Sequence, residues 1–256
     1  VGQGDDGVDL DNGASGNVIR GNLISGHAVN GIDFFAASGN AISGNLIGLD
    51  ATGTVALANG DGGILISGQN NIIGGTTAAE RNVVSGNGGD GIRLTGATTT
   101  GNQIIGNYIG TDASGMAAVG QGDDGVDIDN GASNNTIRGN LISGNAFDGI
   151  DLNGASGNAI SGNLIGLDAN AAVALGNGGN GILILSSNNN IVGGMTAADR
   201  NVVSGNAGNG IVLTGAAATV ISPIPAASVG EIAYVQGGSR YTAPAREEDG
   251  LPLQAG

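Results

Sequence analysis

The sequence predicts an all-β solenoid, a parallel β-helix of about eight rungs with three short strands in each rung. Three observations support this fold. The 256-residue chain repeats itself at a long and a short period, its apolar residues alternate with polar ones, and its 53 glycines recur between the alternating segments. Alternation that ends at glycine or asparagine is typical of β-strands, and self-similarity every 20 to 50 residues or so is typical of solenoids.

The long repeat covers most of the chain. The segment GQGDDGVDLDNG near the N-terminus returns as GQGDDGVDIDNG, so that Asp5 corresponds to Asp123 at an offset of 118 residues. Val1 corresponds to Val119, which lies inside a repeat. We therefore expect the chain to be cut from a longer precursor, with further rungs on its N-terminal side.

Each long repeat contains four short units. A unit opens with G-I-x-L and continues with two segments of the form N-x-I-x-G, such as NVIRG and NLISG. These segments give three strands in each rung, and the stacking of rungs supplies the apolar core that a single rung lacks. The inward positions predicted in the first copy are Val8, Leu10, Ile19, Ile24, Ile32, Ile42, Ile47, Ile64, Ile66, Ile92, Leu94 and Ile104.

The regular pattern ends near residue 220. Residues 1–220 are predicted to form the β-helix domain, and residues 221–256, which hold all four prolines, an irregular cap, tail or linker. One further irregular strand is expected near residues 232–235.

Two longer motifs give the chain a known likeness. SGNAISGNLIG and RNVVSGNGGDGIRLTG resemble the right-handed parallel β-helix repeats of the pectin-lyase-like superfamily, and the resemblance covers about residues 5–215. It implies a right-handed coil. It does not select a function, because that superfamily includes polysaccharide lyases, hydrolases, epimerases, adhesins and phage spikes.

Asparagine recurs at two positions of the unit. Such a residue tolerates a left-handed turn and can bond to its copies above and below, so we expect structural ladders in preference to a row of sugar-binding amides. His27 occupies the position of Asn145 in the second copy and is assigned to a ladder as well. One predicted ladder contains Asn17, Asn40, Asn70, Asn102, Asn135, Asn158 and Asn189, and the other Asn22, Asn45, Asn107, Asn140 and Asn163.

The chain is strongly acidic. It has 22 carboxylates, seven basic residues that are all arginine, and a formal charge of −15. So little positive charge argues against binding to nucleic acid. No apolar run is long enough for a transmembrane helix, so no membrane span is expected. The sequence has no cysteine, so disulfides do not stabilise it.

The variable position of G-I-x-L carries the most chemistry. Alternation turns it outward, which places Asp9 beside Asp33 and Asp127 beside Asp151 on neighbouring rungs, about 4.8 Å apart. Carboxylates at that spacing raise one another's pKa or bind a cation, and ligands that are all oxygen favour calcium. A solvated acidic stripe is the alternative. The candidate ligands, one weak site in each long repeat, are Asp5, Asp6, Asp9, Asp11, Asp33, Asp123, Asp124, Asp127, Asp129 and Asp151.

Two functions are compatible with these residues. The first is a non-catalytic module of a secreted or cell-surface bacterial repeat protein, a rigid spacer or an adhesive surface that contacts a polysaccharide or cell-surface glycan. It is favoured because the outward acids are duplicated, whereas an active site is normally unique. The alternative is a calcium-dependent polysaccharide lyase or other carbohydrate-active enzyme with Arg93 as the base, since Val212 replaces Arg93 in the second copy. In either case, the candidate binding residues are Asp9, Asp33, Arg93, Asp127 and Asp151.

Insertions mark two corners of the coil. Extra residues at 49–61, 111–123 and 167–179 precede G-I-x-L strands and are expected to project from one corner. A shorter insertion, GTTAAER, recurs as GMTAADR at another corner. Its Arg81 and Arg200 are expected to pair with Glu80, Asp199 or nearby carbonyls in a structural role.

Overall fold

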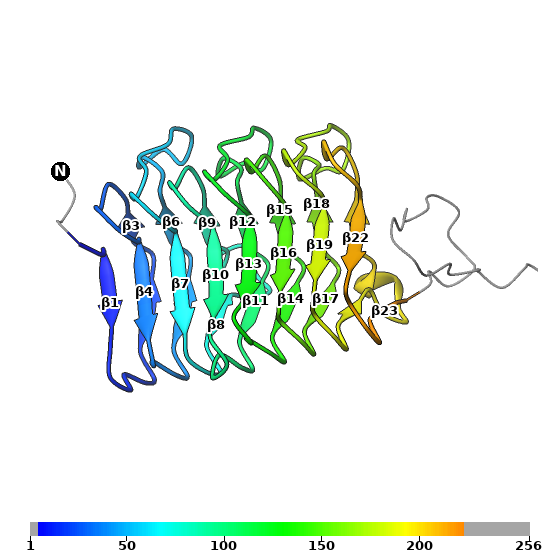
Figure 1. The fold of residues 1–256 in the computed structure, drawn as a ribbon. Coiled ribbons are helices and arrows are strands. Elements are labelled where there is room, and N and C mark those ends of the chain that lie inside the picture. The colour runs from blue at the N-terminus through cyan, green and yellow to red at the C-terminus, as the bar shows by residue number, and fades with distance from the viewer. Residues whose placement is uncertain (1–4, 223–256) are drawn as a thin grey trace, which may run out of the picture.

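A computed structural model describes residues 5–222 of the chain. The chain winds into a rod in which each strand pairs in parallel with its counterpart on the next rung (Figure 1). Three sheets run along the rod, two with eight strands and one with seven. The prediction of an all-β parallel β-helix of about eight rungs, with three strands in each, is confirmed.

The strands are short, from two to four residues. The first sheet contains β1 (Val8–Leu10), β4 (Ile32–Phe35), β7 (Ile64–Ser67), β10 (Ile92–Thr95), β13 (Val126–Asp129), β16 (Ile150–Asn153), β19 (Ile182–Leu185) and β22 (Ile211–Thr214). The second contains β2 (Val18–Arg20), β5 (Ala41–Ser43), β8 (Ile72–Gly74), β11 (Gln103–Ile105), β14 (Thr136–Arg138), β17 (Ala159–Ser161), β20 (Ile191–Val192) and β23 (Val220–Ile221). The third contains β3 (Leu23–Ile24), β6 (Leu46–Ile47), β9 (Val83–Val84), β12 (Tyr108–Ile109), β15 (Leu141–Ile142), β18 (Leu164–Ile165) and β21 (Val202–Val203).

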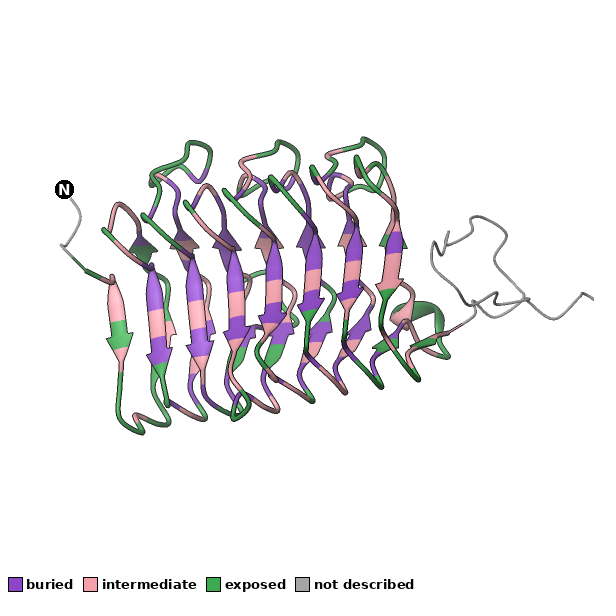
Figure 2. Ribbon diagram, viewed as in Figure 1, coloured by how far each residue is buried: buried purple, intermediate pink, exposed green. Residues whose placement is uncertain are grey.

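The core is the aliphatic interior of the rod. All of the predicted inward residues belong to it or pack against it, and Phe34 is fully buried among them. Buried and partly exposed positions alternate along the strands of the first sheet (Figure 2). This alternation is the reason that the period of two in the sequence sets the register of the whole rod.

Asparagine ladders join the rungs at the corners, as predicted. In the ladder of the second predicted set, the amide of Asn82 donates to Asn107 and that of Asn107 to Asn140, at 2.9 and 3.1 Å. In the other set, the prediction of Asn70 and Asn189 is wrong. These residues take a positive φ at the turn, and the following residues, Asn71 and Asn190, continue the ladder.

A third ladder was not predicted as such, although His27 was assigned to its position. The backbone N–H of His27 donates to Asn59 (3.2 Å), and the amide of Asn59 donates to Asn87 (2.8 Å). Asn87 in turn donates to the side chain of Gln121. The three longer insertions lie at this corner and include Asn59, Gln121 and Asn177, so the step between ladder residues varies and hides the repeat. The rungs after Gln121 continue it through Asn145, Asn177 and Asn206.

The longer insertions project together from the corner between the third and first sheets, as predicted (Figure 1). Each closes through an antiparallel bridge, such as that of Leu49 with Ala56. They also touch one another, because the N–H of Ala113 donates to Gly53 and that of Ala169 to Gly115, at 2.8 and 2.9 Å. The three loops therefore form a ridge along one edge of the rod.

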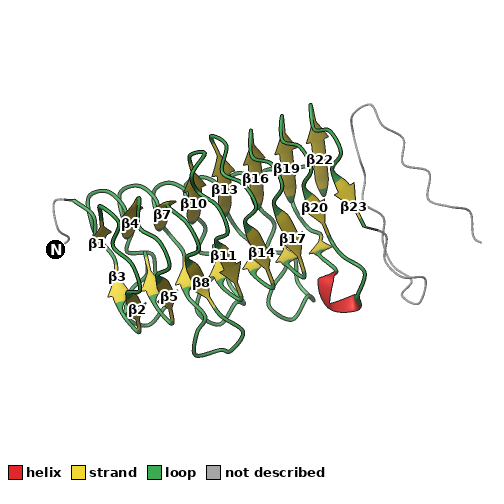
Figure 3. Ribbon diagram, turned by 90° about the horizontal axis from the view of Figure 1, so that it is seen from below, coloured by secondary structure: helices red, strands yellow, loops and turns green. Residues whose placement is uncertain are grey.

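Helical structure is confined to the short η1 (Ala197–Asp199) within residues 5–222 (Figure 3). In the same part of the chain, no helix has the length and hydropathy needed to cross a membrane. The last described strand is β23. Almost all of the predicted cap or tail at 221–256, including the strand expected near 232–235, lies outside the described residues.

Candidate functional site

The first sheet carries an acidic outer surface, which we call the acidic face. It consists of Asp9, Asp33, Arg93, Asp127, Asp129 and Asp151. The predicted register is confirmed, because Asp9 pairs with Asp33 and Asp127 with Asp151 across neighbouring strands. Alternation along β1, β4, β13 and β16 turns these side chains away from the aliphatic core.

Arg93 is held by two carboxylates of the next rung. Its Nε lies 3.2 Å from Asp127 Oδ2 and its Nη2 lies 2.5 Å from Asp129 Oδ2. Burial disfavours the charged guanidinium, but the hydrogen bond and charge of Asp129, together with the charge of Asp127, outweigh it and raise the pKa of Arg93 above its ordinary value. A proton held this strongly makes Arg93 a poor base.

A cluster of three acids lies at the corner before β10 and β13. Ligand oxygens of Asp90, Asp123 and Asp124 all lie within 4.8 Å of one another, the separation at which one cation can bridge them. Calcium takes six to eight oxygen ligands, roughly, so this cluster would supply part of a coordination shell and water the remainder. The donor set therefore fits a weak calcium site.

Two buried carboxylate oxygens of the acidic face lack a hydrogen-bond partner. Oδ1 of Asp129 and Oδ1 of Asp151 are buried, and neither forms a hydrogen bond with any of residues 5–222. An unpaired buried oxygen is costly, and a bound cation or a proton would remove the cost. The charge of Asp151 acts on Asp124, so the candidate site extends from the corner to Asp151 on the acidic face.

The environment of the cluster favours protonation. Burial, with repulsion from Asp90 and Asp129, raises the pKa of Asp127 to about 8. Burial also raises the pKa of Asp124 to about 8, against the effect of the hydrogen bond from the N–H of Asp148. The pKa of Asp151 and that of Asp90 each rise to about 6 for the same principal reason.

Among residues 5–222 the three-acid cluster forms at the second copy, and the equivalence of the two predicted sites stays a prediction. In the first copy, Asp6 accepts a hydrogen bond from the N–H of Asn30 (2.6 Å) and Asp9 is exposed. Asp5, Asp6 and Asp11 are not part of a three-acid cluster among residues 5–222. The rung before the second copy contributes Asp90, whereas no rung precedes the first copy among residues 5–222. The predicted ligands Asp123 and Asp124 therefore lie close to a third acid, Asp90.

Asp90 was missed by the sequence analysis, although the sequence contains a signal for it. The residue directly before each G-I-x-L glycine is an acid or an asparagine in seven of the eight units: Asp6, Asn30, Asp90, Asp124, Asp148, Asn180 and Asn209. The structure stacks this column, so that the N–H of Asp124 donates to Asp90 (3.1 Å) and the N–H of Asp148 to Asp124 (2.6 Å). Because each residue of this column bonds to the next one, the column places Asp90 beside Asp124.

Comparison with protein families agrees with this architecture. A family model described as a right-handed β-helix region matches residues 55–223. The chain belongs to the right-handed β-helix family. This match confirms the right-handed coil that the resemblance implies. No curated protein sequence matches the chain.

The chain is also similar to solved structures. The periplasmic alginate epimerase AlgG is 17% identical over 80% of this chain and 45% of its own, with a TM-score of 0.45. The A-module of the Azotobacter vinelandii mannuronan C-5 epimerase AlgE6 is 19% identical over 84% of this chain and 53% of its own, with a TM-score of 0.39. The chain thus spans about half the length of these proteins.

Proposed function

We propose that the chain is a rigid, non-catalytic module of a secreted or cell-surface bacterial repeat protein, and that it serves as a spacer or glycan-contacting surface. The observation that carries the proposal is the state of Arg93. It is the unique outward residue of the acidic face, and it is bound to both Asp127 and Asp129. The remaining positions of the face are duplicated acids.

We further propose that calcium stabilises the rod at Asp90, Asp123 and Asp124, with Asp151 beside it. The closeness of the three acids and the unpaired buried Oδ1 of Asp151 support this proposal. A site with few protein ligands should bind in the range of about 10⁻⁴ to 10⁻³ M, which is typical of extracellular modules. Further rungs on the N-terminal side would belong to the same rod.

The melting temperature in EDTA is expected to be lower at pH 8.5 than at pH 5.5, by roughly 5 °C. The pKa of Asp127, about 8, exceeds that of an unfolded aspartate, so the folded state holds the proton more tightly. The contribution of this proton to stability is therefore fully present below about pH 4 and is lost as the pH rises through 8. Millimolar calcium should restore the midpoint at pH 8.5 by binding the native state.

The control for this prediction is built into the repeat. Asp123→Asn/Asp124→Asn should abolish the response to calcium, whereas the corresponding Asp5→Asn/Asp6→Asn should retain it, because the three-acid cluster forms in the second copy. Thermal melts followed by circular dichroism measure both variants. A parent midpoint that calcium leaves unchanged at pH 8.5 would contradict the calcium site and leave a solvated acidic stripe.

The alternative function, a polysaccharide lyase or related enzyme, is tested by turnover. We expect no release of unsaturated uronides from pectate or alginate, and no cleavage of neutral glycans, with or without calcium. The reason is that the candidate base, Arg93, is ion-paired and keeps its proton. Product formation that disappears in Arg93→Ala would reverse the order of the two functions.

A further inference from the structure

A second surface feature lies away from the acidic face, over the second and third sheets. A pocket of about 570 Å³ opens between the corner turn at 75–81 and the outer surfaces of β11, β12 and β14. We call it the arginine pocket, because Arg81 and Arg138 line it and no carboxylate does. The other lining residues are Gly75, Thr76, Thr77, Gln103, Ile105, Gly106, Tyr108, Thr136 and Gly139.

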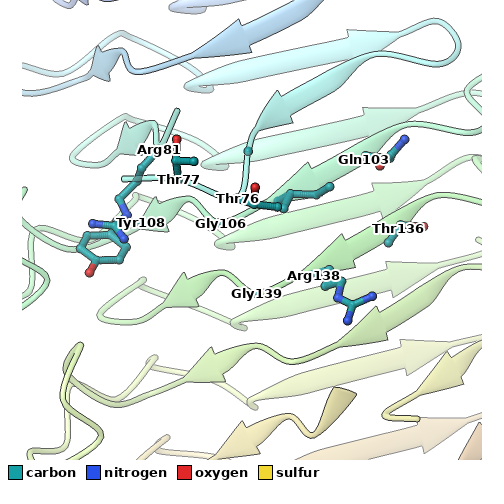
Figure 4. A pocket seen from close by; sticks show the side chains of 11 residues that line it. Thr76, Thr77, Arg81, Gln103, Gly106, Tyr108, Thr136, Arg138 and Gly139 are labelled. Atoms are coloured by element: carbon teal, nitrogen blue, oxygen red, sulfur yellow. The ribbon is translucent and has the colours of Figure 1, made fainter. Parts of the chain in front are cut away.

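The two arginines approach the pocket from opposite sides. Figure 4 shows Arg81 with Tyr108 on one side, Arg138 on the other, and Gly106 and Gly139 between them. The guanidinium carbon of Arg81 lies 3.9 Å from the centre of the Tyr108 ring. The predicted pairing of the corner insertions is therefore wrong for Arg81, which stacks on Tyr108. Glu80 binds Thr77.

Each arginine keeps donor capacity for a ligand. The guanidinium of Arg81 stacks on Tyr108 and forms no ion pair with a carboxylate among residues 5–222. Arg138 is half exposed, and it pairs through Nη2 with Asp199 Oδ1 at 3.1 Å. A guanidinium has five N–H donors, so this ion pair leaves others available to the pocket. Two cations without a lining acid are unusual in a chain of charge −15, and they make this pocket a local site for an anion.

Two columns of stacked positions, one along the second sheet and one along the third, contain apolar residues on every described rung except at this pocket. Outward residues in the column of Gln103 and Thr136 are otherwise Val18, Ala41, Ile72, Ala159, Ile191 and Val220. The column of Tyr108 otherwise contains Leu23, Leu46, Val83, Leu141, Leu164 and Val202. The coil does not need Gln103, Thr136 and Tyr108 at these positions, because apolar residues occupy the same positions on every other described rung.

We infer that the arginine pocket binds a small polyhydroxylated anion, a sugar that carries one carboxylate or sulfate group. The guanidinium groups match the anionic group, and Thr76, Gln103 and Thr136 offer hydrogen bonds to hydroxyls. Tyr108 and Ile105 supply an apolar surface for the ring, and the volume suits one or two sugar units. The choice of a sugar as the ligand rests on the glycan-contacting role proposed above. The inference is independent of the proposed calcium site.

The test is an NMR titration of the whole chain in EDTA with glucuronate, glucose 6-sulfate, glucose and the methyl ester of glucuronate. We expect the two anions to bind with dissociation constants in the millimolar range and the two neutral sugars to bind at least tenfold more weakly. Arg81→Gln and Arg138→Gln should each weaken anion binding about tenfold. An oligosaccharide that ends in glucuronate distinguishes a terminal glycan unit from the free sugar as the source of the ligand.

Two matched variants make the result decisive. Arg20→Gln removes the first-copy counterpart of Arg138, which does not line the pocket, and should leave binding unchanged. Gln103→Ile/Tyr108→Leu restores residues found elsewhere in the two columns, so the coil should fold while binding is lost. Equal binding of charged and neutral sugars, or retention of anion binding in both arginine variants, would overturn the inference. In the second case, glycan binding elsewhere on the rod would leave the proposed function intact, whereas a parent that binds no sugar would count against both.

Discussion

Replacing Gly48 by alanine is expected to lower the free energy of unfolding by at least about 4 kcal/mol, or to prevent folding. Gly48 follows β6 with a φ of +82°, in the left-handed region that disfavours a side chain. A Cβ there would also lie 2.2 Å from the backbone oxygen of Ser85 and 2.3 Å from Oδ1 of Asn87 on the next rung. Backbone at that separation cannot yield without opening the contact between rungs.

Gly21→Ala separates the two causes. Gly21 has a φ of +70°, but a Cβ at this position meets no atom within 4 Å. Its substitution should cost about 1 kcal/mol, which is the conformational penalty alone. Urea unfolding of both variants measures the difference. Similar midpoints would mean that the rungs move apart easily and that close approach does not limit the packing of this solenoid.

Replacing Asn107 by alanine should lower the free energy of unfolding by about 3 kcal/mol. Asn107 is fully buried in the middle of a ladder. Its Oδ1 accepts from both the backbone N–H and the amide of Asn82, and its own amide donates to the carbonyl of Ile73. Alanine would leave these buried groups unpaired in two rungs at once.

The exposed Asn153 serves as the matched control. It lies at the end of β16, and Asn153→Ala should change stability by no more than about 0.5 kcal/mol. The same urea series measures both substitutions. A small loss for Asn107→Ala would indicate that water enters the corner, and that the ladders follow from the fold without stabilising it.

The repeat and its alternation were sufficient to predict most of the fold. In a solenoid each rung contacts its neighbours, so a local pattern repeated along the chain also specifies the long-range pairing. The pairing of Asp127 with Asp151 and the burial of Ile104 therefore followed from the positions of these residues in the unit. The position of a residue within the repeating unit therefore determines its position in the rod.

Part of the acidic site could be predicted in the same way. Outward acids follow from alternation, so the sequence identified Asp123, Asp124 and the acidic face. It could not weigh the depth of burial that raises the pKa of Asp127 to about 8, because this depends on what covers each rung. The column of acids before the G-I-x-L glycines does mark Asp90 as a neighbour of Asp124, but the separation of their oxygens depends on how one corner stacks on the next.

The sequence by itself determined the coil, its register, its inward residues and which acids face outward, because each depends on periodicity. The tertiary structure decided the features that depend on the path of individual corners. The left-handed backbone conformation of Asn70 shifts the ladder to Asn71. The turn at 75–81 brings Arg81 onto the ring of Tyr108. A corner has no period, and its course is set by backbone conformations and contacts with adjacent rungs that exist only once the rod has formed.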